Sequence, residues 1–194
     1  MKKFILPIIT TTLLSGCSKN PEEIIAACLE NAEHTQSRNL NGDLDGVQRA
    51  INHSTRLGSC LASELELDSH ESDASKAQTI LDFVSKNIAY KVDETGTKTP
   101  AKTLNDKEGD CEDFTALTGT ILHAAHVDFY LIDRPPFEKG ELGHVFVGIE
   151  SKEKTGMECD GKHLSIVDAT DTAATVGVES YEKEYEFTCR LIKN

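Results

Sequence analysis

The pattern of apolar and polar residues changes along the chain from a helical to a strand-like period. Apolar residues recur at helical spacing in four segments, which we expect to be helices. These helices are predicted at residues 20–32, 47–65, 77–88 and 111–125, with an interruption at Gly58 in the second. Runs rich in β-branched and aromatic residues predict strands at 127–132, 143–149, 164–168 and 185–191.

Two connections in this pattern are long and polar. Residues 91–108 contain Gly96 and Pro100 and lead directly to Cys111. Loops of this length are often functional, so we expect this one to form a wall of a substrate cleft. Residues 150–162 are rich in charge and are predicted to be a hairpin loop.

Cys111 stands where a glycine-acid turn ends and the fourth predicted helix begins. Asp110 is a good N-cap, and Glu112 and Asp113 in the first turn suit the positive end of the helix dipole. Amide groups at a helix N-terminus stabilise a thiolate and can bind an oxyanion. Cys111 is therefore a candidate nucleophile, and the alternative is a small buried residue without chemistry.

A base and an orienting carboxylate follow at the ends of two predicted strands. His144 opens the strand at 143–149, and Asp168 closes the strand at 164–168. If these strands pair antiparallel, the two side chains meet at one end of the sheet. With Cys111 they would form a nucleophile, base and orienter arrangement.

Other histidines fit the role of base less well than His144. His123 and His126 follow Cys111 on the same predicted helix, about 18–23 Å along its axis, which is too far for proton transfer. His163 precedes the strand at 164–168 and is the main competitor, but it lacks the Gly-His-Val context of His144.

Three short motifs resemble the core motifs of the transglutaminase-like superfamily: Gly109-Asp110-Cys111-Glu112-Asp113-Phe114, Gly143-His144-Val145 and Val167-Asp168-Ala169-Thr170. The first motif is similar to a run found in the bacterial cysteine-proteinase branch. The resemblance covers roughly residues 75–190. It implies an α+β, papain-like fold in which a catalytic Cys helix packs on an antiparallel sheet. It also implies a catalytic triad of Cys111, His144 and Asp168.

The resemblance leaves the group that binds the oxyanion unassigned. Many members of the superfamily place an aromatic residue near the thiol, whereas this chain has no Trp. Asn105, six residues before Cys111, would offer a side-chain amide instead. Glu112 and Asp113 are interpreted as helix-capping residues; pairing with basic residues, or binding calcium as in the proteinase branch, are the alternatives. No other cofactor is expected.

The N-terminus has the features of an export signal. Lys2 and Lys3 precede the apolar run 4–14, which is too short to span a bilayer. The run ends in Leu14-Ser15-Gly16-Cys17, which resembles a bacterial lipobox. We therefore expect residues 1–16 to be removed and Cys17 to carry lipid, and Ser18 favours sorting to the outer membrane. The alternative is an ordinary signal peptide with an incidental cysteine.

The six cysteines fit an oxidising compartment such as the periplasm. Setting aside Cys17 for lipid and Cys111 for chemistry leaves four, which allow three pairings. We favour Cys28–Cys60 and Cys159–Cys189, because each pair joins neighbouring elements of the chain. Four reduced, buried cysteines are the alternative.

The charge of the chain restricts its partners. The formal net charge is −13, and it becomes −15 when residues 1–16, with their two lysines, are removed. A surface this acidic argues against nucleic acid or anionic lipid as a ligand. The mature chain is long enough for one core, which we expect in a monomer with an N-terminal helical extension at 17–70 and a catalytic core at 71–194.

These observations predict a membrane-anchored, periplasm-facing thiol enzyme that transfers an acyl group from a peptide or isopeptide amide. Cys111 would attack the carbonyl carbon, and His144 would protonate the leaving amine. Water or an amine would then resolve the thioester; hydrolysis is favoured because water is present at about 55 M. The rival prediction is a non-catalytic binding or scaffolding lipoprotein that retains the fold.

Overall fold

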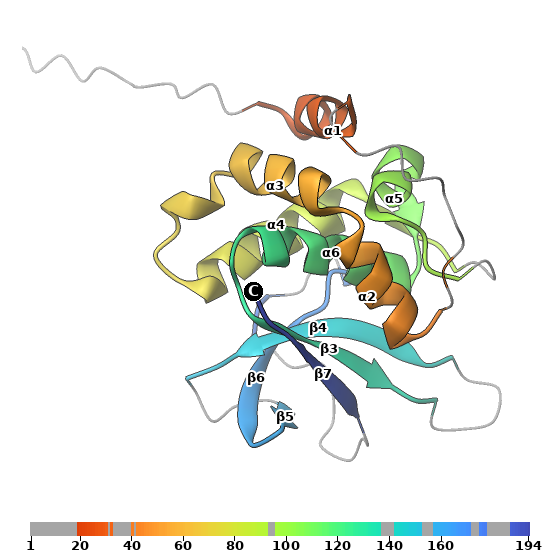
Figure 1. The fold of residues 1–194 in the computed structure, drawn as a ribbon, viewed down its shortest axis with the longest axis vertical. Coiled ribbons are helices and arrows are strands. Elements are labelled where there is room, and N and C mark those ends of the chain that lie inside the picture. Colours follow the sequence, from red (N-terminus) through yellow and green to blue (C-terminus); the bar gives the residue numbers. More distant parts are fainter. Residues whose placement is uncertain are drawn as a thin grey trace, which may run out of the picture.

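The computed structural model describes residues 19–30, 32, 40, 42–92, 96–136, 142–152, 157–171, 175–177 and 187–194. A layer of helices covers one face of an antiparallel sheet (Figure 1). This arrangement confirms the predicted α+β, transglutaminase-like fold class. Cys17, the predicted lipidation site, lies outside the described residues. No helix in the described part of the chain is long and apolar enough to cross a membrane.

The helices lie mainly in the first two thirds of the chain and the longer strands in the last third, as the hydrophobic pattern predicts. The helices are α1 (Pro21–Glu30), α2 (Leu44–Asn52), α3 (Thr55–Glu64), the 3-10 helix η1 (Leu67–Ser69), α4 (Asp73–Asn87), α5 (Pro100–Asp106) and α6 (Cys111–Ala124). The strands are β1 (Ala89–Tyr90), β2 (Glu108–Gly109), β3 (Phe129–Arg134), β4 (His144–Glu150), β5 (Met157–Cys159), β6 (Lys162–Val167) and β7 (Thr188–Ile192).

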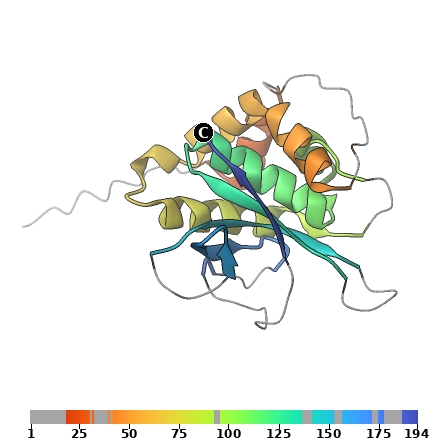
Figure 2. The ribbon, with the colours of Figure 1, turned by 60° about the horizontal axis from the view of Figure 1, so that its bottom comes forward.

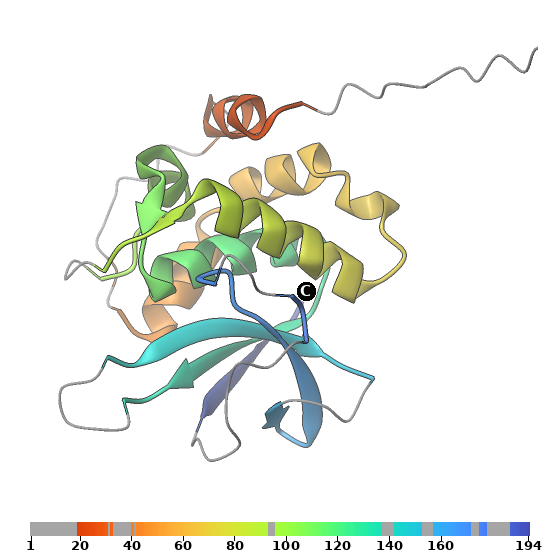
Figure 3. The same cartoon turned by 180° about the vertical axis from the view of Figure 1, so that it is seen from behind.

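Helix α6 is the central element of the fold. It packs against α2, α3, α4 and α5 and against strands β3 and β4. Figures 2 and 3 show it enclosed between the other helices and the sheet. Every residue from Asp113 to Leu122 is buried, so the helix is covered on all sides rather than along a single apolar stripe. The packing of α6 therefore fixes the position of its first residue, Cys111.

Five strands form the sheet in the order β5-β6-β4-β3-β7, and all neighbours are antiparallel. Successive side chains of a strand point to opposite faces. On β3, Phe129 and Leu131 therefore join the large core under the helices, whereas Tyr130 and Ile132 join a second cluster on the other face. Because both faces are covered, the central strands are apolar almost throughout, rather than alternating with polar residues.

The second predicted helix is two helices, and its break is not at Gly58. Helix α2 ends at Asn52 and α3 begins at Thr55, so the chain turns at residues 53–54. Gly58 lies inside α3, where a Cβ atom would meet the carbonyl oxygen of Thr120 at 2.6 Å. The glycine therefore allows α3 to approach α6 closely, and it does not interrupt the helix.

The two long connections contain regular structure that the sequence pattern did not predict. Residues 91–108 include α5 and the start of β2, which pairs in parallel with β1. The charged segment 150–162 includes β5, an edge strand of the sheet. These elements have two to seven residues, too few to produce a recognisable hydrophobic period.

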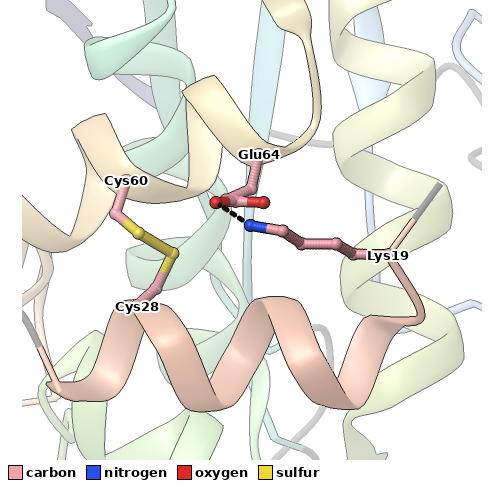
Figure 4. The surroundings of a disulfide bond; sticks show 4 residues. All are labelled: Lys19, Cys28, Cys60 and Glu64. Carbon is pink, nitrogen blue, oxygen red and sulfur yellow. Dashed lines mark hydrogen bonds and ion pairs between the residues drawn. A yellow bond between two sulfur atoms is a disulfide. The ribbon is translucent and has the colours of Figure 1, made fainter. Parts of the chain in front are cut away.

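Disulfides join Cys28 to Cys60 and Cys159 to Cys189. The first links α1 to α3, and Lys19 pairs with Glu64 beside it at 2.7 Å (Figure 4). The second links β5 to β7, the two opposite edges of the sheet. A bond between opposite edges requires the sheet to curl around its second apolar cluster, which contains Cys159 and packs against Cys189.

Candidate active site

The turn before α6 explains the residue types of its Gly-Asp-Cys-Glu-Asp motif. Asp110 is the N-cap, and its side chain and that of Asp113 each accept a hydrogen bond from the other residue's backbone N–H. A Cβ atom on Gly109 would meet the Cβ atom of Asp113 at 2.6 Å. Only glycine therefore fits before this cap, and Asp113 has a structural role.

Asp113 also fixes the segment that precedes α5. Its carboxylate accepts a hydrogen bond from the Lys98 backbone N–H at 2.6 Å and pairs with the Lys98 ammonium at 3.1 Å. The Asp113 side chain is fully buried. Burial raises its pKa, and the hydrogen bonds and charge of Lys98 oppose this shift. The expected capping role of Asp113 therefore agrees with the structure, which adds an ion pair.

Cys111 is the first residue of α6, and its side chain is largely buried. Its Sγ donates to Oε2 of Glu112 at 3.1 Å. Burial and the negative charge of Glu112 raise the pKa of the thiol, while a hydrogen bond from the Val145 backbone opposes this shift. These effects disfavour the thiolate of Cys111 at rest, and Glu112 contacts the thiol instead of capping the helix.

His144 and Asp168 meet at one end of the sheet. Strands β4 and β6 pair as far as Val147 and Val167, and the two side chains lie beyond this last pair. Nε2 of His144 is 2.7 Å from Oδ2 of Asp168. Oδ1 of the same carboxylate accepts hydrogen bonds from the backbone N–H and the hydroxyl of Thr170, at 3.1 and 2.7 Å.

Two contacts orient the base relative to the nucleophile. The His144 ring stacks on Phe146, with centroids 5.6 Å apart. The hydroxyl of Thr115, one turn after Cys111, donates to the carbonyl oxygen of Val145 at 2.9 Å. The helix that carries the thiol is thus bonded to the strand that carries the imidazole.

Cys111 and His144 line one open cavity of about 240 Å³. The predicted loop at 91–108 contributes only Val92 from its described residues, and the other walls come from elements far apart in sequence. The remaining lining residues are Gly42, Asp43, Tyr90, Asp110, Glu112, Asp133, Leu142, Gly143 and Val145. The cavity is large enough for one extended side chain and the backbone atoms beside it.

Tyr90 is a cavity residue that the sequence did not identify. It belongs to β1, lines the cavity, is about half exposed, and contacts Phe114 with ring centroids 6.1 Å apart. Burial, and secondarily the neighbouring Cys111 and Asp110, raise its pKa, so the phenol keeps its proton. An aromatic hydrogen-bond donor therefore lies beside the thiol despite the absence of Trp.

The cavity has an acidic wall. Burial and the neighbouring Glu112 raise the pKa of Asp110 to about 7. The pKa of Asp133 is also raised, again by burial first and Glu112 second. Carboxyl groups this close disfavour one another's ionisation, so part of the wall is protonated near neutral pH.

Several candidate residues lie elsewhere. Asn105 is in α5, where its amide contacts Asp106 at 3.4 Å, so it does not line the cavity and is not the oxyanion donor. His163 is the second residue of β6, opposite Glu158. His123 is in the last turn of α6, and His126 follows that helix in a left-handed conformation. None of these residues lines the cavity of Cys111.

The acidic residues beside Cys111 have partners within the protein in this arrangement. Asp113 is occupied by Lys98, and Glu112 accepts from the thiol. Over the described ranges, no group of three or more His, Cys, Asp or Glu side chains is arranged to hold a metal ion.

The geometry can be compared with known proteins. Residues 59–155, half of the chain, match the family model for the transglutaminase-like domain. The match starts earlier than the motifs indicate, includes Cys111 and His144, and ends before Asp168. No curated protein matches the chain at a significant level.

One solved structure is similar in outline. It is a crystal structure from Cytophaga hutchinsonii that is named as a candidate cysteine protease, with 16% sequence identity and a TM-score of 0.45. The similarity covers 78% of this chain and 56% of that structure's length. A likeness at this level carries no inference about activity. The assignment rests on the family match over half of the sequence: this chain belongs to the transglutaminase-like domain family.

Proposed function

We propose that this protein is a thiol enzyme that cleaves peptide or isopeptide amides through a Cys111 thioester. The observation that carries the proposal is that Cys111 and His144 line one cavity while His144 is paired with Asp168 at 2.7 Å. A nucleophile, a base within the same cavity and a carboxylate on the base are the parts that acyl transfer requires. Membership of the transglutaminase-like family supports the same class of reaction.

In the first step, the thiol proton moves to His144 as Sγ of Cys111 bonds to the amide carbonyl carbon. Nε2 of His144 contacts Asp168, so the proton would be taken up at Nδ1. When the carbon–nitrogen bond breaks, the same proton leaves with the amine. In the second step, His144 removes a proton from water, the hydroxide oxygen bonds to the carbonyl carbon, and the carbon–sulfur bond breaks. His144 returns this proton to Sγ of Cys111, so the products are a carboxylic acid and the original thiol.

Deprotonation of Cys111 would be coupled to attack. The raised pKa of Cys111 opposes a resting thiolate–imidazolium pair. The helix N-terminus would still have a role, because backbone N–H groups at a helix N-terminus can stabilise an oxyanion. The Tyr90 hydroxyl would be a second donor to that oxygen.

We also propose that residues 1–16 direct export and that Cys17 is lipidated, which would hold the domain at the periplasmic side of the outer membrane. The sequence supports this with its lipobox-like Leu14-Ser15-Gly16-Cys17. Two disulfides are consistent with an oxidising compartment. A protein or peptide at the membrane surface would then be the substrate of a monomeric enzyme.

Hydrolysis of p-nitrophenyl acetate, a small activated ester, tests the proposal without knowledge of the natural substrate. We expect Cys111→Ala to abolish turnover and His144→Ala to reduce it by about 10²–10⁴-fold, the usual effect of a general base. Asp168→Asn should have an intermediate effect, and His163→Ala should leave the rate unchanged. Equal rates for the wild type and His144→Ala would favour the non-catalytic binding module instead.

A further inference from the structure

We propose that the Cys111 cavity selects a substrate that carries an alkylammonium group, such as a lysine side chain, next to an apolar residue beside the reacting amide. This inference rests on the proposed function, because it names the substrate class of the same site. Two independent features of the cavity lead to it: its acidic wall and its exposed apolar rim.

The acidic wall consists of Asp43, Asp110, Glu112 and Asp133. Neither Lys nor Arg is among the lining residues in the part of the chain that the structure describes. His144 is paired with Asp168, so this pair adds no net positive charge in either protonation state. The carboxylates of the wall that stay ionised therefore give the cavity a negative potential, and low-dielectric walls strengthen such a potential relative to an open surface.

Two nearby lysines among the described residues pair with carboxylates outside this wall. Lys98 is committed to Asp113, which is on the buried side of the Cys111 turn. Lys91 pairs with Glu108 at 2.7 Å, outside the cavity lining. In the part of the chain that the structure describes, neither lysine therefore occupies the carboxylates that face the cavity.

The apolar rim consists of Tyr90, Val92 and Leu142. These side chains are 48%, 53% and 67% exposed, and they are the three most exposed large hydrophobic residues in the described part of the chain. All three line the Cys111 cavity. Exposed apolar side chains that gather at the mouth of a cavity favour an apolar contact with a ligand.

A lysine side chain matches both features. Its four-carbon stem can pack on apolar surface while its ammonium group reaches polar surroundings. In a cavity of about 240 Å³, such a stem would lie against the rim and its ammonium against the carboxylates. An anionic side chain would be repelled by the wall. The occupant to which we commit is therefore a peptide segment with a lysine-like cation and an apolar neighbour.

The same contact would assist catalysis. Glu112 contacts the thiol and raises its pKa. An ammonium group beside Glu112 would offset that negative charge and make the thiol proton easier to transfer to His144. Binding of the correct substrate would thus increase the reactivity of Cys111.

Charge-matched thiol reagents test the selectivity of the cavity without catalysis. The probes are the 2-(trimethylammonium)ethyl and 2-sulfonatoethyl methanethiosulfonates, which carry opposite charges on chains of the same length. We expect the cation-to-anion rate ratio at Cys111 to exceed the ratio for 2-mercaptoethanol by about tenfold or more, within the range seen for focusing clefts. A ratio equal to that of 2-mercaptoethanol would overturn the proposal.

Neutral variants of the wall test whether these carboxylates cause the preference. Asp43→Asn keeps its helix-capping ability, and Asp133 caps no helix, so the double variant Asp43→Asn/Asp133→Asn should retain the fold. It should lower the ratio to within about twofold of that of 2-mercaptoethanol. If the double variant does not fold, the single variant Asp133→Asn is the test, and it should lower the rate ratio several-fold.

The matched control is Asp68→Asn, which removes one charge from the exposed turn η1, far from the cavity lining. It should leave the ratio unchanged. An equal decrease of the rate ratio in Asp68→Asn would show that the net charge of the chain, and not the wall of the cavity, causes the preference. This result would overturn the proposal. The reagents can show no charge preference in a protein that still turns over the ester. The rate ratio therefore tests this inference separately from the proposed function.

The ammonium group could come from the amide substrate or from an amine that resolves the thioester, and n-butylamine distinguishes the two. Inhibition of p-nitrophenyl acetate turnover by n-butylamine without acyl transfer would assign the cation site to the amide substrate. Formation of N-butylacetamide faster than hydrolysis would assign it to an acyl acceptor, as in a transglutaminase. Neither inhibition nor transfer at high amine concentration would contradict the proposal.

Discussion

The hydroxyl of Thr115 donates a hydrogen bond to the carbonyl oxygen of Val145 at 2.9 Å. Thr115 lies one helical turn after Cys111, and Val145 directly follows His144. Thr115 is buried. This bond therefore sets the distance and angle between the helix that carries the nucleophile and the strand that carries the base.

Thr115→Val should reduce both stability and ester turnover. The variant keeps the shape of the side chain but leaves the buried carbonyl oxygen of Val145 without this donor, which costs about 1–3 kcal/mol of unfolding free energy. Thr120→Val is the matched control, because the Thr120 hydroxyl is also buried in α6 but bonds within that helix, to Ala116. Chemical denaturation and p-nitrophenyl acetate kinetics measure the two effects. Equal losses of turnover in both variants would remove the positioning role of Thr115.

Glu112→Gln should make Cys111 react faster with iodoacetamide. The negative charge of Glu112 raises the pKa of the thiol, so its removal lowers that pKa and increases the thiolate fraction at any pH below it. In the wild type, alkylation should be slower than for a free cysteine and should still rise with pH above about 8.5, the usual pKa of a thiol. Glu71→Gln, an exposed site away from the cavity lining, is the control. A slower or unchanged rate in Glu112→Gln would contradict this role.

The candidate site shows which residues a sequence pattern can identify. Cys111, His144 and Asp168 stand at the ends of long elements with clear periods, so their placement follows once the strands pair antiparallel. Asp43 and Tyr90 were missed, because α2 and the two-residue strand β1 reach the cavity only through packing around α6. No local period in the sequence encodes that packing.

The fold also has features that follow from the sequence pattern and features that depend on tertiary packing. The class of each long element follows from its hydrophobic period. The position of the break between α2 and α3 does not follow from this period. Gly58 is in a helix because it permits close contact with Thr120, which belongs to a helix distant in sequence. The meeting of β5 and β7 at Cys159 and Cys189 likewise depends on the curl of the whole sheet.

Replacing both Cys28 and Cys60 with Ser should lower the unfolding free energy by about 2–4 kcal/mol, as expected for a closed loop of this size. The bridge closes a loop with a sequence separation of 32 residues and joins α1 to α3. Denaturant titration measures the loss. Mass-tagging of the oxidised, unfolded domain without Cys17 should find one thiol, at Cys111; three or more tagged thiols would contradict the pairing.

Cys17→Ala should release the protein from the membrane fraction without loss of the fold. The lipobox-like motif predicts that lipid is attached at Cys17, and the helices of the described domain offer no alternative span. Cell fractionation with detection of the protein measures the change, and thermal unfolding of the purified variant checks the fold. Retention of the variant in the membrane fraction would argue against lipid anchoring.

Rapid-quench mass spectrometry of Cys111 during p-nitrophenyl acetate turnover tests the central claim most directly. The account predicts an acetyl group on Cys111 that forms before hydrolysis products accumulate and then disappears. In His144→Ala this group should form at least about 10²-fold more slowly, whereas in His163→Ala it should form at the wild-type rate. Acetylation of Cys111 at the same rate in the wild type and His144→Ala, or acetylation of a different residue, would contradict the account.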